Sequence, residues 1–84
     1  MPYSILKKRI KILKERGFYK DHGLCYVKVY KLNNWYLHQA ISYFDILYSS
    51  WELNEYLDHL YEKNMRILFE RVLQDEFLRR NSND

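Results

Sequence analysis

Few side chains in this 84-residue sequence have the type and spacing that chemistry needs. The metal-ligand candidates are His22, His38, His59 and Cys25. They share no ligand spacing with one another, so we expect no metal site. Glu55, Asp58 and Glu62 recur at helical spacing, which is typical of a solvated acidic face. Because the sequence also lacks a nucleophile elbow and a glycine-rich phosphate loop, we expect no catalytic residues, no cofactor and no enzyme activity.

Charge is divided unevenly along the chain. Residues 1–31 carry nine Lys and Arg against two acids, whereas residues 32–84 carry five against nine acids. The net charges of these two segments are therefore 9 − 2 = +7 and 5 − 9 = −4. Such a division predicts a partner that is attracted electrostatically to the first third of the chain.

A basic amphipathic helix is predicted over residues 4–16, and Gly17 is expected to end it in the left-handed conformation. Its polar side carries Lys7, Lys8, Lys11 and Lys14. We expect this face to bind nucleic acid or an acidic partner, with Lys28 and Lys31 extending it. The alternative is a lysine face that is only solvated.

Residues 18–20 and 24–30 flank a short glycine-containing loop, which predicts a β-hairpin. Strand alternation would direct Cys25, Val27 and Val29 inward. The outer face would then carry Tyr26, Lys28 and Tyr30. Such a face, extended by Trp35 and Tyr36, is typical of a protein contact, and it also resembles a platform on which single-stranded bases stack.

Residues 35–48 are predicted to form the central helix, capped by Asn33 and Asn34. The next helix is expected to begin at a capping box in which the Ser49 hydroxyl accepts from the Glu52 amide. Leu53, Leu57 and Leu60 would form its buried stripe.

Beyond Asn64 the apolar stripe is rotated by roughly a third of a turn. Its members are Met65, Leu68, Phe69, Val72 and Leu73. We favour a helix break near Asn64, and the alternative is a continuous helix whose last turns pack on something different, such as a second subunit. We predict a subunit or partner interface at this stripe, with Phe69 near its centre. The alternative is that the stripe belongs to the core, which requires the helix to break at Asn64 and fold back.

These elements predict an α+β fold that is mainly helical, and an all-α helical bundle is the alternative. We expect one compact domain over residues 1–80 and a frayed polar tail over residues 81–84. A domain this small is marginally stable alone, and a homodimer is one arrangement that would stabilise it.

The sequence shows no secretory signal and no apolar run long enough to span a membrane. Its single cysteine fits a reducing compartment, which favours the cytoplasm. We interpret the chain as a small non-enzymatic interaction protein, a regulator or inhibitor that docks on a larger protein, with a composition common among phage and mobile-element proteins. The alternatives are a nucleic-acid-binding accessory protein and a structural subunit of a larger assembly.

Overall fold

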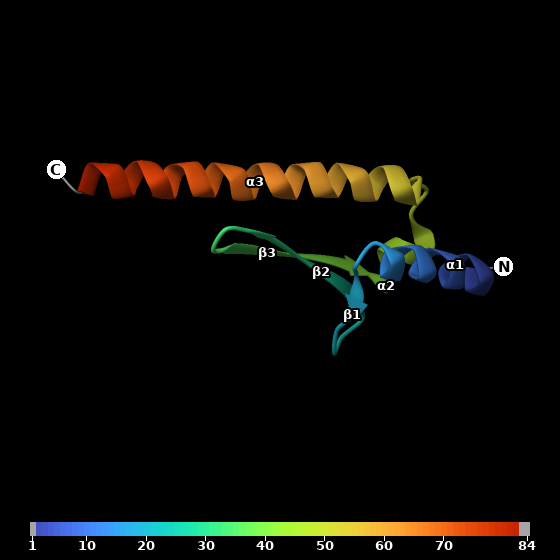
Figure 1. The fold of residues 1–84 in the computed structure, drawn as a ribbon. Coiled ribbons are helices and arrows are strands. Elements are labelled where there is room, and N and C mark those ends of the chain that lie inside the picture. The colour runs from blue at the N-terminus through green and yellow to red at the C-terminus, as the bar shows by residue number, and fades with distance from the viewer. Residues whose placement is uncertain (1, 83–84) are drawn as a thin grey trace.

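The computed structural model describes residues 2–82, and its elements follow the order helix, three strands, short helix, long helix. One face of a three-stranded antiparallel sheet lies against the long helix α3, and helices α1 and α2 lie at the end of the sheet nearest the start of α3 (Figure 1). The fold is α+β and mainly helical, so the expected class is confirmed. The all-α alternative is wrong because the two longer strands are each eight residues long.

Helix α1 spans Pro2–Glu15 and confirms the predicted basic helix. Gly17 has a φ of 93°, and its amide donates to the Lys14 carbonyl at 3.1 Å. The Phe18 amide donates to the Leu13 carbonyl at 2.9 Å. These two hydrogen bonds form a Schellman motif, which requires the left-handed residue that glycine supplies most readily.

The sheet consists of β1 (Tyr19–Lys20), β2 (Cys25–Leu32) and β3 (Trp35–Ser42) in sequential order. The hairpin of β1 and β2 confirms the predicted one. The helix predicted over residues 35–48 is wrong for residues 35–42, which pair with β2 along their whole length, and is confirmed only for residues 43–48. Aromatic and branched side chains there suit a strand, and Asn33, with a φ of 53°, makes a tight turn where we had expected a helix cap.

The predicted assignment of the two faces of β2 is also wrong. Tyr26 is buried beside Tyr43 and α1, and Tyr30 is buried beside Tyr61 of α3, whereas Val29 is exposed on the opposite face. Strand alternation fixes which residues share a face, but it does not say which face is inward. The tyrosines take the buried face because their rings have more apolar area to remove from water than the valine and cysteine side chains.

Helix α2 spans Tyr43–Tyr48, directly after β3. Its N-cap is Ser42, whose hydroxyl accepts from the Asp45 amide at 3.1 Å. The predicted capping box is wrong, because the Ser49 hydroxyl accepts from the Trp51 amide at 3.3 Å instead of from Glu52. Helix α3 begins at Leu53, four residues after Ser49.

Helix α3 spans Leu53–Ser82 without interruption, so the predicted break near Asn64 is wrong and the continuous alternative holds. Asn64 is buried within the helix, and its side-chain amide donates to Gln39 Oε1 on β3 at 3.1 Å. A buried polar side chain with a partner on the sheet joins the two elements, and the helix remains intact. The polarity of Asn64 therefore reflects a contact with the sheet.

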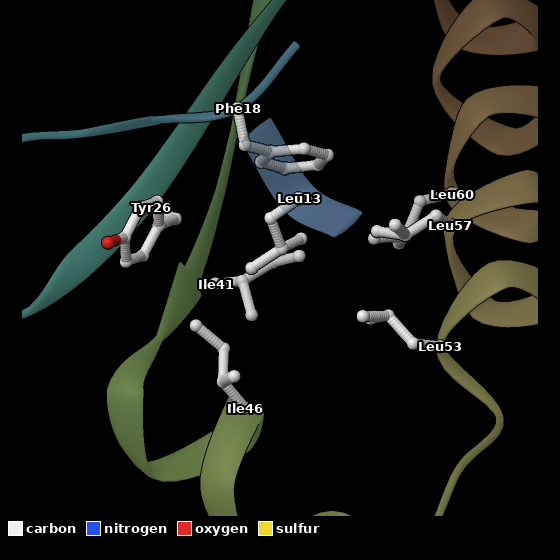
Figure 2. Close-up of a cluster of buried hydrophobic side chains, with 8 residues drawn as sticks. All are labelled: Leu13, Phe18, Tyr26, Ile41, Ile46, Leu53, Leu57 and Leu60. Atoms are coloured by element: carbon white, nitrogen blue, oxygen red, sulfur yellow. The ribbon is translucent and has the colours of Figure 1, made fainter. Parts of the chain in front are cut away.

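The core lies where α1, α2, the sheet and the first half of α3 meet. Leu13, Ile41 and Ile46 face the three leucines that α3 contributes, Leu53, Leu57 and Leu60, and Phe18 and Tyr26 complete this cluster (Figure 2). Two arginines of the α1 region make polar contacts around this core. Arg9 donates to the carbonyls of Ile46 and Ser49 at 2.6 and 3.0 Å, and Arg16 forms an ion pair with Asp58 on α3.

The molecule is elongated. Its radius of gyration is 16.5 Å, against about 12 Å for a compact domain of this length. The C-terminal end of α3 extends beyond the β2–β3 turn and accounts for this shape (Figure 1). Asn81 and Ser82 belong to α3, although we placed them in a frayed tail; the rest of that tail, residues 83–84, lies outside the described residues.

Candidate interaction surfaces

The lysines of α1 divide between two sides of the helix. Lys7, Lys11 and Lys14 line one shallow groove, whose floor includes Ile10 and Tyr26. Lys8 borders a different hollow, beside Trp51. The predicted four-lysine face is therefore three lysines over a partly aromatic floor, and Glu15 at its edge reduces the net positive charge.

Lys28 does not extend this basic groove. Its Nζ lies 4.9 to 5.9 Å from the ring centres of Phe18, Tyr30 and Tyr61, on the face of the sheet that α3 covers. Burial lowers the pKa of the Lys28 amine, and the nearby Arg16 guanidinium lowers it further. Three aromatic rings therefore lie around this half-buried cation, which is not among the residues that line the groove.

Lys31 lies on the opposite, open face of the sheet, with its Nζ 5.3 Å from the centre of the Tyr36 ring. Several neighbours on this face are also exposed. They are Tyr19, Val29, Tyr36, His38 and Ala40. Strands β1, β2 and β3 contain no Asp or Glu, so the open face of the sheet combines aromatic and apolar surface with positive charge.

Along the distal half of α3, apolar side chains stand in solvent. Phe69, Leu73 and Phe77 are 56%, 51% and 63% exposed. They recur every four residues, which places them along one side of the helix. Sequence reasoning found Phe69 and Leu73 but missed Phe77, although its spacing continues the same stripe.

The residues predicted as a protein interface therefore separate into three groups. Tyr26, Tyr30 and Leu68 are buried within the chain and cannot form such a surface. Phe69 and Leu73 are exposed, as an interface requires. The remaining two, Met65 and Val72, are half-buried. Of the sheet residues that the sequence assigned to the interior, Val29 is exposed, and Cys25 and Val27 are half-buried.

Neither a metal site nor a membrane helix emerges from the described part of the chain. Residues 2–82 contain no group of three or more His, Cys, Asp or Glu side chains placed to hold an ion. None of the helices in this range combines the length and apolar character that crossing a bilayer requires. In comparisons with known proteins, the chain matches no family model, no curated protein and no solved structure. The surfaces themselves must therefore support any proposal about function.

Proposed function

We propose that this chain is a small non-enzymatic protein that docks on a larger protein in the cytoplasm and regulates or inhibits it. The observation that carries the proposal is the amount of apolar surface left in solvent. Among the described residues, 14 large hydrophobic side chains are exposed and 10 are buried. Scattered exposed apolar residues are ordinary, but seven of these fourteen lie on two surfaces, as in proteins that bind partners. Four are on the strands, namely Tyr19, Val29, Trp35 and Tyr36, and three are along one side of α3, namely Phe69, Leu73 and Phe77.

The open face of the sheet is the surface best suited to the larger protein. Tyr19 and Tyr36 are both about half exposed, and Val29 lies on the same face. Tyrosine contributes a large rigid contact area together with a hydroxyl, which is why it is enriched at protein interfaces. Lys31 and His38 lie on this face without a carboxylate from the strands, so we expect an acidic partner surface with apolar side chains at its centre.

The proposal is tested by affinity capture from the native host followed by mass spectrometry. Tyr36→Glu places a carboxylate on the open face of the sheet, where it would repel an acidic partner. Tyr3→Glu is the matched control, because Tyr3 is 69% exposed on α1. We expect one larger protein to be captured by the wild type and by Tyr3→Glu, and to be lost with Tyr36→Glu. Equal capture by all three chains would exclude the open face as the docking surface.

Nucleic-acid binding is the second candidate, because Lys7, Lys11 and Lys14 line one groove. If these lysines neutralise three phosphates, the affinity should fall with a slope of about 2.7 log units per log unit of salt. Fluorescence anisotropy with mixed-sequence DNA and RNA measures this slope. The triple substitution of these lysines by Glu should abolish binding, whereas Lys63→Glu, on an exposed position of α3, should preserve it. Absence of binding at low salt would remove this candidate.

A further inference from the structure

The exposed side of distal α3 carries charges as well as apolar residues. On a helical wheel, eight side chains fall within an arc of about 120° that points away from the sheet. Four are apolar, namely Met65, Phe69, Leu73 and Phe77, and four are charged, namely Glu62, Arg66, Glu76 and Arg80. We call these eight residues the outer face of α3. All of them except Met65 and Glu76 are exposed, and those two are half-buried.

The outer face is complementary to itself when two copies of the helix lie antiparallel: apolar positions meet apolar positions, and acidic positions meet basic ones. If two α3 helices lie antiparallel with residue 71 of each at the centre, residue i of one helix lies level with residue 142 − i of the other. Phe69 is then level with Leu73, and Met65 is level with Phe77. Each apolar residue of the outer face therefore meets another apolar residue at the same height along the pair.

The charged residues follow the same rule. Glu62 lies level with Arg80 of the second copy, about 14 Å from the centre of the pair. Arg66 lies level with Glu76 of the second copy, about 8 Å from the centre. All four levels therefore bring opposite charges together. A parallel pair in register would instead set each charge beside its own kind, so the charges favour the antiparallel arrangement.

The rest of the molecule does not obstruct this antiparallel arrangement. Leu57, Leu60 and Asn64 mark the side of α3 that faces the sheet and core, and they lie on the opposite side of the wheel from Phe69. A second copy on the outer face would therefore meet α3 on the side away from the sheet. The two sheets would lie on the far sides of the helix pair.

We propose that the outer face of α3 binds a second copy of this chain, forming an antiparallel two-helix homodimer centred near Arg71. A pair related by two-fold symmetry presents the same patch from both copies, and such a patch must be complementary to itself. The paired order of apolar and charged residues provides that complementarity. The interface is separate from the open face of the sheet, so the dimer would present two copies of the proposed docking surface.

Charge reversal gives a test that does not depend on disrupting the fold. Arg66→Glu sets two glutamates level with each other at two places in the dimer, and Glu76→Arg does the same with two arginines. We expect each variant alone to associate about tenfold more weakly than the wild type, as measured by sedimentation velocity. Mixing the two variants restores opposite charges at both places, so the mixture should recover dimer of wild-type affinity.

Phe69→Asp places a charge at the apolar centre and should give a folded monomer with an unchanged circular-dichroism spectrum. Lys63→Glu is the control, because Lys63 is exposed on α3 but lies outside the outer face; it should leave the dimer intact. A wild-type chain that remains monomeric at the highest attainable concentration would overturn the proposal. So would a dimer that resists Arg66→Glu, or a mixture of the two charge variants that stays monomeric.

Discussion

The change in stability on replacing Asn64 distinguishes a continuous α3 from a helix that breaks at this residue. Its side chain is 2% exposed and donates to Gln39 Oε1 at 3.1 Å. Replacing it with alanine removes this hydrogen bond and leaves Gln39 Oε1 without its donor beneath α3. We therefore expect Asn64→Ala to destabilise the protein.

The magnitude follows from opposing contributions. Losing this hydrogen bond and leaving its acceptor without a donor destabilises the fold by about 2 kcal/mol, while alanine's better helix propensity returns about 0.6 kcal/mol. The net loss is therefore about 1.5 kcal/mol, or a fall in Tm of about 6 to 12 °C. Urea unfolding monitored by circular dichroism measures it, with all chains compared at one protein concentration.

Asn54→Ala is the matched control, since Asn54 is exposed in the first turn of α3; we expect a change within about 0.5 kcal/mol. Gln39→Ala completes a double-mutant cycle. The loss from Asn64→Ala should shrink when Gln39 is already alanine, because the two side chains share a hydrogen bond. If the helix ended at Asn64 and the side chain faced water, alanine would be neutral or stabilising. That result would refute the continuous, sheet-bound helix described above.

Three further predictions concern the core and the ends of the helices. Arg9→Ala should destabilise the fold by about 2 kcal/mol in urea unfolding, because the guanidinium donates to two carbonyls at the C-terminal end of α2, whereas Lys11→Ala should be nearly neutral. Gly17→Ala should lower stability by about 1 kcal/mol in the same assay, since φ is 93° there; an unchanged midpoint would mean that the Schellman turn does not form. Burial raises the pKa of Tyr26 and Tyr30, so their folded pKa values lie above their unfolded ones and stability should decline as pH rises past about 10. Tyrosinate absorbance should show that Tyr26 and Tyr30 ionise at higher pH in the folded protein than after unfolding.

How much of the fold could be predicted depended on whether local chemistry or packing decided each element. Helix α1 and its end at Gly17 were predictable because the glycine and the amphipathic pattern act locally. The hairpin of β1 and β2 was predictable for the same reason. Residues 35–42 were not, since their apolar residues fit a helical arc as well as a strand, and pairing with β2 decides between the two.

Which residues of the candidate sites are exposed depended even more on tertiary packing. The two faces of β2 were exchanged, because packing against helices distant in the sequence determines which side is covered, and α3 lies more than 20 residues further along the chain. That exchange moved Tyr26 and Tyr30 from the expected surface into the interior and brought Val29 out. Phe69 and Leu73 were predictable because their stripe is rotated relative to the buried leucines Leu53, Leu57 and Leu60. The structure places both residues on the side of α3 away from the sheet.

The proposed docking on a larger protein is tested most directly by photocrosslinking inside the native host. A photoreactive phenylalanine analogue at Tyr36 would sample the open face of the sheet, and the same analogue at Tyr3 would sample an exposed site on α1. We predict one discrete adduct from Tyr36, much larger than two chains, resistant to nuclease and absent from Tyr3. An adduct that nuclease removes, one with the mass of two chains, or none at all would contradict the proposal.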